Sequence, residues 1–310
     1  MKVMVTGGAG FIGSNLVDRL IDDGHGVVVV DDLSSGREEN LHPDATFYRQ
    51  DIRDESLEEV FAREGIEAIF HLAAQMDVRK SVADPVYDAR VNILGTINLL
   101  QSALKHGLKK FVYASTGGAV YGEPRFMPVT EEHPINPDCQ YGISKHTVEH
   151  YLYVYHRLQG LNWTALRYPN VYGPRQNPHG EAGVVAIFIQ LLSAGKRCTI
   201  FGDGSKTRDY VYIDDVVEAN VIALERGDNA CYNLGWGTEV SDFTIFDTVR
   251  NSLGLEDEPR YEDVRAGEIF HISLEASKIR EQLGWAPKVS LEHGVARTIE
   301  WYRRTGGVGR

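Results

Sequence analysis

The chain has 310 residues, of which 43% are hydrophobic, and at roughly 150 residues per domain this length predicts two lobes. The formal net charge is −12, with acidic and basic residues interspersed, which argues against nucleic acid as a partner because phosphate backbones need a clustered cationic face. Cys139, Cys198 and Cys231 are widely spaced and the histidines do not cluster, so we expect neither a disulfide framework nor a metal site. Without a signal peptide or an apolar run of about 20 residues, we expect a cytoplasmic protein with no membrane partner.

Short apolar runs alternate with helical spacing through the first half of the chain. Strands are expected at Lys2–Thr6, Val27–Val30, Thr46–Tyr48, Ala68–Leu72 and Lys110–Ala114. Helices are expected at Phe11–Ile21, Ser56–Glu64 and Pro85–His106. Strands that alternate with helices predict right-handed βαβ units, and therefore an α/β fold with a doubly wound parallel sheet of the Rossmann type.

The helix–strand pattern continues with Tyr141–Gln159 and Trp163–Arg167, and it becomes irregular after Pro169. We therefore predict a dinucleotide-binding domain over residues 1–168 and a smaller, mixed substrate lobe over residues 169–310. Because Tyr210–Leu224 again has the pattern of a strand and a helix, the chain is expected to return to the first domain at about 210–235.

The glycine-rich segment Thr6–Gly13 directly follows the first predicted strand and opens the first predicted helix. Glycines at such a position permit a tight turn and a close approach of the backbone to a pyrophosphate, which the helix N-terminus faces. Glycines alone also occur in ordinary turns. Here strand, loop, helix and second strand follow in the order of a dinucleotide-binding unit, which favours the functional interpretation.

Asp31 ends the second predicted strand, about 20 residues beyond the glycines, where a carboxylate accepts hydrogen bonds from the adenosine ribose. Because a carboxylate repels a 2′-phosphate, this position favours NAD over NADP, a preference that Arg37 would soften. The alternative is that Asp31 is a solvated loop residue. Asp32, the more solvated of the two acids, is expected with Ser35 and Gly36 at the ribose end of the site.

Tyr141 and Lys145 lie at i and i+4, on one face of a predicted helix. A free phenol has a pKa of about 10 and is a poor base at neutral pH. A neighbouring ammonium, together with a positive nicotinamide ring, would lower that pKa and make Tyr141 a proton acceptor; the alternative is an ordinary amphipathic surface. Ser115 and Thr116 end a strand at the carboxyl edge of the sheet, where a hydroxyl can hydrogen-bond the substrate oxygen that Tyr141 deprotonates.

Six motifs follow one another along nearly the whole chain. They are TGGAGFIGS (Thr6–Ser14), HLAAQ (His71–Gln75), STGGAVYG (Ser115–Gly122), YGISK (Tyr141–Lys145), RYPNVYGPRQ (Arg167–Gln176) and RDYVYIDD (Arg208–Asp215). In this order they resemble the UDP-glucose 4-epimerase family of the extended short-chain dehydrogenase/reductase superfamily.

The resemblance implies an NAD site with contacts from successive loops. The glycine loop would hold the pyrophosphate, the loops after the third and fourth strands would flank adenine and line the cofactor, and Lys145 would hold the nicotinamide ribose. The cofactor residues that it implies are Gly7, Gly10, Phe11, Ile12, Gly13, Asp31, Asp51, Ile52, Leu72, Ala73, Ala74, Gln75, Asn92, Tyr141, Lys145 and Tyr168.

A UDP-hexose substrate is implied in the same way, and so is a homodimer formed through the helices at 85–106 and 141–159. Thr116 matches the family's catalytic hydroxyl, with Ser115 as the fallback because the match can slip by one residue. The forked guanidinium groups of Arg208 and Arg265 also match phosphate oxygens by their own geometry. Arg208, beside Asp209, could instead form a surface ion pair. The residues implied for the substrate are Thr116, Tyr141, Asn170, Val185, Phe201, Arg208, Arg265 and Ile272.

Two glycines distinguish among the reactions of this superfamily. The 4,6-dehydratases carry an Asp-Glu pair directly after the threonine, where this chain has Gly117 and Gly118, so we expect the glycines to leave room for a keto-sugar to turn. Related enzymes for UDP-glucuronate typically have Thr in place of Asn170 and Arg in place of Asn177. These differences favour an epimerase for an uncharged UDP-hexose; another nucleotide sugar, or a non-catalytic NAD-binding sensor, remain as alternatives.

Three further positions bear on how the site would work. Cys139-Gln140 stands where relatives often have Ser-Pro, and Met76 stands where some carry a lysine toward the cofactor phosphates. Ile272 lies where the family walls the sugar pocket near C2, so it is expected to allow weak turnover of N-acetylated sugars, unless it merely fills core.

Overall fold

The computed structural model describes residues 1–179, 183–264 and 269–306. Its centre is a seven-stranded, all-parallel sheet in the order β11-β6-β5-β4-β1-β2-β3. The strands are β1 (Lys2–Thr6), β2 (Gly26–Asp31), β3 (Thr46–Arg49), β4 (Ala68–His71), β5 (Lys110–Thr116), β6 (Asn162–Tyr168) and β11 (Ala230–Asn233). The Rossmann-type α/β fold predicted from the sequence is confirmed, and the first six strands lie within two residues of their predicted positions.

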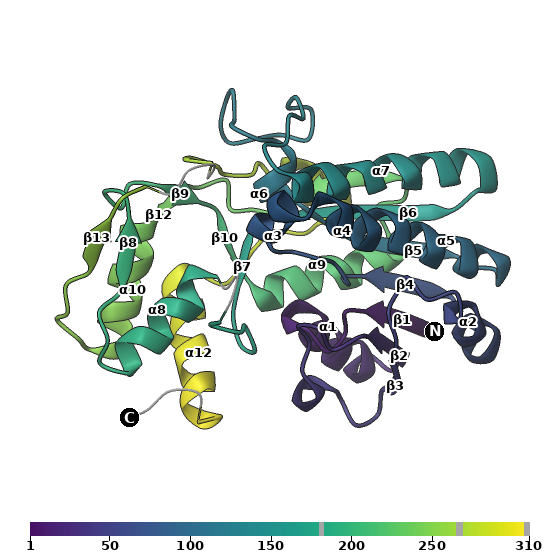
Figure 1. Cartoon of the computed structure of the whole chain (residues 1–310), viewed down its shortest axis with the longest axis horizontal. Coiled ribbons are helices and arrows are strands. Elements are labelled where there is room, and N and C mark those ends of the chain that lie inside the picture. Colours follow the sequence, from purple (N-terminus) through teal and green to yellow (C-terminus); the bar gives the residue numbers. More distant parts are fainter. Residues whose placement is uncertain (180–182, 265–268, 307–310) are drawn as a thin grey trace.

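Helices cover both faces of this sheet (Figure 1). Alternate strand residues point to opposite faces, so Val3 and Val5 belong to one hydrophobic cluster and Met4 belongs to the other. The first face is covered by α1 (Phe11–Asp22) and α9 (Ile213–Glu225), and the second by α2 (Leu57–Glu64), α5 (Thr96–Lys105) and α7 (Gln140–Gln159). Strands buried on both faces need continuous apolar runs, which is why they were predictable.

The helix predicted over Pro85–His106 is interrupted. It consists of α4 (Pro85–Ala89), a π-helical segment (Arg90–Gly95) and α5. A short helix that the sequence did not predict, α3 (Val78–Ala83), precedes it. A π turn holds an extra residue and is frequent at functional sites, so the interruption directs attention to Asn92, which lies within it.

Smaller elements form the rest of the chain, to the left in Figure 1. They include three two-stranded sheets, which pair β7 (Asn170–Tyr172) with β10 (Tyr210–Tyr212), β8 (Thr199–Phe201) with β13 (Arg260–Glu262), and β9 (Thr207–Arg208) with β12 (Val240–Ser241). The helices here are α8 (Val184–Ser193), α10 (Asp242–Leu253) and α12 (Leu291–Arg304), whereas α11 (Ser277–Leu283) packs beside β11 of the central sheet. Apolar residues of α8, α10 and α12 belong to the same cluster as Val3 and Val5, so one core continues from the sheet into this region.

Between these elements the chain passes back to the sheet, where α9 packs on α1 and β11 pairs with β6 as an edge strand. The division into domains at residue 168 stays a prediction. In the part of the chain that the structure describes, no helix is both long and apolar enough to cross a membrane.

Candidate active site

Two glycines at the passage from β1 into α1 have no room for a side chain. Gly7 has φ +71°, and a Cβ there would lie 2.7 Å from the backbone nitrogen of Ala73, while a Cβ on Gly13 would overlap the carbonyl oxygen of Gly7. The amide of Gly10 also donates to Gly7 O at 3.1 Å. Only glycine tolerates these positions, and the turn places the α1 N-terminus at the carboxyl edge of the sheet. This cradle fits a dinucleotide pyrophosphate.

Asp31 is fixed at the end of β2 rather than solvated. Its side chain is 7% exposed, and its carboxylate accepts from the amide of Ala9 at 3.0 Å and from the amide of Leu33 at 2.8 Å. Burial raises the pKa of Asp31. A Cβ on Gly36 would lie 2.8 Å from Asp31 Oδ1, so this glycine lets the loop close against the carboxylate. The alternative interpretation of Asp31 as a solvated loop residue is therefore wrong.

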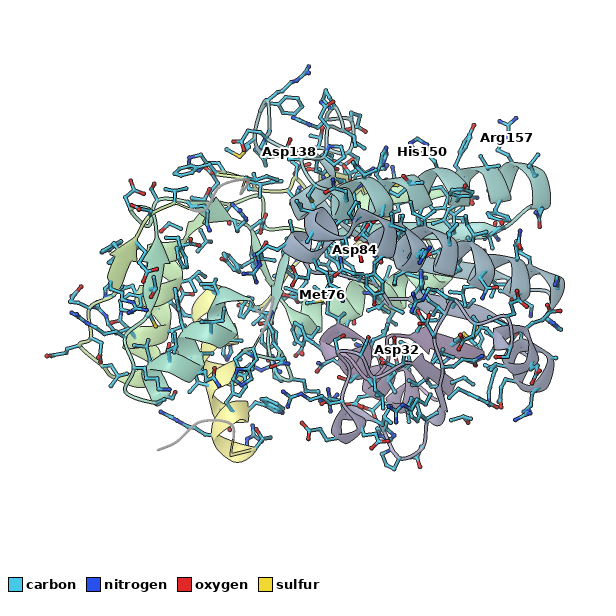
Figure 2. The ribbon with its side chains drawn as sticks, viewed as in Figure 1. Asp32, Met76, Asp84, Asp138, His150 and Arg157 are labelled. Carbon is cyan, nitrogen blue, oxygen red and sulfur yellow. The ribbon has the colours of Figure 1, made fainter. Side chains whose placement is uncertain are left out.

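The neighbouring residues of this corner are more open. Asp32 is exposed (Figure 2) and accepts from the amide and the hydroxyl of Ser34, and Ser35 is exposed as well. Asp51 is paired with Arg53, whose hydrogen bonds lower the pKa of the Asp51 carboxyl. The remaining predicted cofactor residues are buried or partly buried along the same edge of the sheet: Phe11, Ile12, Ile52, Leu72, Ala73, Ala74 and Tyr168.

A hydrogen-bonded network joins the loop after β4 to the π-helical segment. The side chain of Asn92 accepts from the amide of Gln75 at 2.8 Å and donates to its carbonyl oxygen at 2.9 Å. It also donates to Asp88 Oδ1 at 3.0 Å and to the hydroxyl of Ser144 in α7 at 3.2 Å. Asn92 thus connects the loop after β4 with α4 and α7, and its supporting role toward a cofactor stays a prediction.

Tyr141 and Lys145 occupy the first turns of α7. The Lys145 ammonium lies 4.6 Å from the centre of the Tyr113 ring, and burial lowers the pKa of Lys145 to about 7. Burial raises the pKa of Tyr141, and the charge of Asp88 contributes in the same direction. The predicted lowering of the Tyr141 pKa involves a positive nicotinamide ring as well as Lys145, so it stays a prediction.

The structure separates the two candidate hydroxyls at the end of β5. Ser115 is buried and donates to Glu149 Oε1 at 2.7 Å, and the guanidinium of Arg167 donates to both oxygens of the same carboxylate, at 3.0 and 2.7 Å. Ser115 is therefore committed to a buried ion pair. Thr116 is partly exposed, and its Oγ1 lies 3.9 Å from the position that a Cβ on Gly118 would take.

Gly117 and Gly118 differ in what surrounds them. A Cβ on Gly117 would overlap the side chain of Leu274, whereas a Cβ on Gly118 would find Asn170 Oδ1 and Thr116 Oγ1 as its nearest neighbours, both at 3.9 Å. Of these two glycines, only Gly118 leaves open space, and that space lies beside Thr116 and Asn170. The expectation that both glycines do so is wrong for Gly117, whose missing side chain makes room for Leu274.

The predicted substrate residues do not all line one surface. Arg208 donates to the carbonyl oxygens of Thr207, at 2.7 Å, and Phe270. Asp209 is buried and accepts instead from backbone amides, including that of Leu274, so the alternative of an Arg208–Asp209 ion pair is wrong. Asn170 is held at the start of β7 by its backbone N–H, which donates to the backbone carbonyl oxygen of Asp209 at 3.0 Å.

Phe201 is partly exposed at the end of β8, next to a hollow of about 600 Å³ lined by Gly202, Asp203, Tyr261, Glu262, Asp263 and Val264. Val185, on α8, is buried in the main hydrophobic core. Ile272 is 2% exposed and packs in a small cluster with Val120, Val129 and Leu274. Arg265, and with it the Arg265–Glu268 motif, lies outside the described residues.

Sequence reasoning missed two buried acids, one on α7 and one on the adjacent α4. Asp88 and Glu149 are almost completely buried, and each is held by side chains from other elements. A charged residue on a helix usually lies on its solvated face, and the sequence around these two gives no sign of the partners that make burial tolerable.

A parallel sheet with a glycine cradle at its carboxyl edge and an acid closing the second strand defines a dinucleotide-binding α/β protein. Residues 3–235 match the model of the NAD dependent epimerase/dehydratase family, and the chain belongs to this family.

Relatives and solved structures agree over almost the full length. The chain is 48% identical to a UDP-glucose 4-epimerase of Mycolicibacterium smegmatis over 98% of this chain and 99% of that protein. It is similar to the crystal structure of a UDP-glucose 4-epimerase with UDP-glucose from Thermotoga maritima, with a TM-score of 0.97, 49% identity, and 98% and 99% of the two chains covered. A UDP-glucose 4-epimerase complex with NAD from Thermus thermophilus gives a TM-score of 0.93 and 42% identity, with the same shares of the two chains covered.

Proposed function

We propose that the protein is an NAD-dependent UDP-glucose 4-epimerase, which interconverts UDP-glucose and UDP-galactose and acts in galactose metabolism. Relatives of this name cover nearly the whole chain. The observation that carries the choice of reaction is the side-chain-free space at Gly118, between Thr116 and Asn170. Gly118 has no side chain that could act as an acid or a base in a dehydration. The space beside it leaves room for a sugar to turn.

The proposed chemistry assigns one task to each side chain. Tyr141 takes the proton from the C4 hydroxyl, and Thr116 hydrogen-bonds the same oxygen and orients it. Lys145, as an ammonium, favours the phenolate form of Tyr141. The glycine cradle and Asp31 would hold NAD⁺, which would supply a reversible hydride acceptor for C4. The chain's own contribution to inversion is space, because the sugar can present its other face only where no side chain blocks its rotation.

The cofactor would be held by the glycine cradle at the pyrophosphate and by Asp31 at the adenosine ribose, where a buried carboxylate disfavours the 2′-phosphate of NADP. Each oxygen of Asp31 accepts one backbone amide and keeps a further lone pair for a ribose hydroxyl. Gln75 and Asn92 would hold the loop beneath the nicotinamide end.

For the substrate, Asn170, Phe201 and Arg208 with Arg265 would bind the uridine diphosphate, because guanidinium groups match phosphate oxygens. Ile272 is the proposed gate for an N-acetyl group at C2. Its burial in a small apolar cluster also agrees with a core-filling role, so the gate rests on the family resemblance and needs its own test.

A homodimer through α7 and the α4–α5 region is part of the proposal. Large apolar side chains are exposed on these helices. Leu158 in α7 is 76% exposed, Val86 in α4 is 58% exposed, and Leu94 in the π-helical segment is 57% exposed. Side chains such as these would be buried in a dimer formed through these helices. Leu158→Glu should lower the mass measured by light scattering toward that of one chain, while Arg157→Glu, which changes a polar neighbour that points outward from α7 (Figure 2), should leave it unchanged.

The proposed compartment is the cytoplasm, which agrees with three free cysteines, Cys139, Cys198 and Cys231. The activity is tested by incubating the purified protein with UDP-galactose and resolving the products by chromatography. UDP-glucose should form without net release of NADH. Parallel reactions with UDP-N-acetylglucosamine and with CDP- and GDP-hexoses identify another nucleotide sugar as the substrate, and no turnover of any of them would favour a non-catalytic sensor.

A further inference from the structure

Asp88 is a carboxylate in α4 that the proposed mechanism does not use. Its side chain is 1% exposed. Burying a charge without partners is costly, so a buried acid needs compensating hydrogen bonds or a nearby cation. Two hydrogen bonds supply part of this compensation: Gln75 Nε2 and Asn92 Nδ2 each donate to Asp88 Oδ1 at 3.0 Å.

Those two donors lead directly to the proposed catalytic residues. Gln75 lies in the loop after β4, and Asn92 lies in the π-helical segment, from which its amide also reaches the hydroxyl of Ser144. That hydroxyl donates to the carbonyl oxygen of Tyr141 at 3.0 Å. One oxygen of Asp88 therefore holds together three elements that meet at the first turn of α7.

We propose that Asp88 is a positioning residue whose carboxylate fixes Gln75 and Asn92 and whose negative charge sets the protonation state of the Tyr141–Lys145 pair. This inference rests on the proposed function for the roles of Tyr141 and Lys145, although the charge acts on them whatever the substrate is.

The electrostatics around α7 support this role. Asp88 raises the pKa of Lys145 and is the largest influence that opposes the lowering by burial, and it adds to the effect of burial in raising the pKa of Tyr141. It acts in the same way on Cys139, the residue that caps α7, whose pKa burial raises. The charge therefore favours the protonated form of the lysine and makes the phenolate a stronger base.

Other ionisable groups share this region, and the test has to separate Asp88 from them. Glu149 on α7 also raises the pKa of Lys145, and it is neutralised by Arg167. Further titratable or charged groups on the elements around Asp88 include His71 on β4, Tyr113 on β5, Arg79 and Lys80 on α3, Asp77 and Asp84 at the caps of α3 and α4, Tyr87 on α4, Arg90 in the π-helical segment and His146 on α7.

Asp88→Asn removes the charge and keeps the geometry. Because both hydrogen bonds end on Oδ1, an asparagine oxygen at the same place can accept both of them. The matched control is Asp84→Asn, an exposed N-cap of the same helix whose side chain accepts from the amide of Tyr87 (Figure 2), because asparagine caps helices as well as aspartate does.

The first measurement is the pH dependence of kcat for the reaction of UDP-galactose. Removing a negative charge lowers the pKa of each neighbour, so the phenol ionises and the ammonium loses its proton at lower pH. In Asp88→Asn both limbs of the profile should move to lower pH, by about one unit. In Asp84→Asn and in the charge-retaining Asp88→Glu they should stay in place. A profile that falls in height without moving would overturn the proposal, since that is what a purely structural role predicts.

The second measurement needs neither substrate nor turnover. The rate at which iodoacetamide alkylates Cys139, followed by mass spectrometry across pH, reports the pKa of a thiol at the start of α7. That pKa should fall in Asp88→Asn and remain unchanged in Asp84→Asn; an unchanged pKa in both would refute the inference. If the wild type does not epimerise any sugar, the proposed function fails, and this comparison still decides the role of Asp88. Should Asp88→Asn not fold, Asp88→Ser, which can accept one bond and carries no charge, takes its place with the same expected shift.

Discussion

Replacing Gly118 by alanine adds a methyl group where the structure has room for it. The nearest neighbours of that methyl group would be Asn170 Oδ1 and Thr116 Oγ1, both 3.9 Å away, an ordinary van der Waals separation. Gly118 lies in the short helix α6 (Gly117–Val120), and alanine is favoured over glycine within helices by about 0.5–1 kcal/mol. We therefore expect Gly118→Ala to be as stable as the parent or slightly more stable.

Activity should move in the opposite direction. The methyl group would stand in the space beside Thr116 that the proposed mechanism gives to the turning sugar. One added group in a pocket is worth about 1–3 kcal/mol, which corresponds to roughly a 10- to 200-fold loss in kcat/KM. A gain in stability combined with such a loss is not produced by general damage to the fold.

Gly117→Ala is the matched control, because it adds the same group one residue earlier. There the methyl group would overlap the side chain of Leu274, and overpacking of this kind costs about 1–3 kcal/mol. Thermal unfolding and kcat/KM for UDP-galactose should be measured on both variants. If Gly118→Ala epimerised UDP-galactose at the parental rate, the sugar would not turn in this space and the reasoning would be refuted.

Four further outcomes are expected. Tyr141→Phe should fold normally and lose at least about 100-fold in kcat, because the ring remains and the proton acceptor does not; near-normal turnover would remove Tyr141 as the base. Asp31→Ala should weaken NAD binding and strengthen NADP binding in calorimetry, whereas equal NAD affinity would place the ribose contact elsewhere. Ile272→Tyr should depress turnover of UDP-N-acetylglucosamine selectively, and a parallel fall for UDP-galactose would exclude it as the gate. Burial opposes ionisation of Glu149, yet the hydrogen bonds from Arg167 hold its pKa at about 2, below the ordinary value. The pair's contribution to the free energy of unfolding should therefore be lost as the pH falls from about 4.5 toward 2. Glu149→Gln should flatten the pH dependence of that free energy over this range.

The central sheet could be predicted because its strands are buried on both faces and are therefore continuous apolar runs, as in Val27–Val30. The short strands β8, β9 and β12 could not, since two or three residues are too few to show a period. The π-helical segment keeps the apolar spacing of a helix on either side, so nothing in the sequence marks where one extra residue enters the turn.

In the candidate site, too, local patterns could be predicted from the sequence and contacts between distant segments could not. The glycine cradle, Asp31 and the Tyr141–Lys145 pair are local patterns, and their positions follow from the chain order. The choice between Ser115 and Thr116 needed the position of Glu149 on another element, and the difference between Gly117 and Gly118 needed the position of Leu274, which comes more than 150 residues later. Contacts between distant segments decide these points, and spacing within one segment cannot.

The π-helical segment Arg90–Gly95 has a consequence for how this region tolerates insertions and deletions. A π turn differs from an α turn by one residue, so a chain that lost one residue there could continue from α4 into α5 as an ordinary helix with its hydrogen bonds intact. Each residue of an α-helix turns the chain by about 100°, and α4 would rotate by that amount against the rest. Asp88 would then face away from Gln75. A single deletion at this point should leave a folded protein whose site is dismantled.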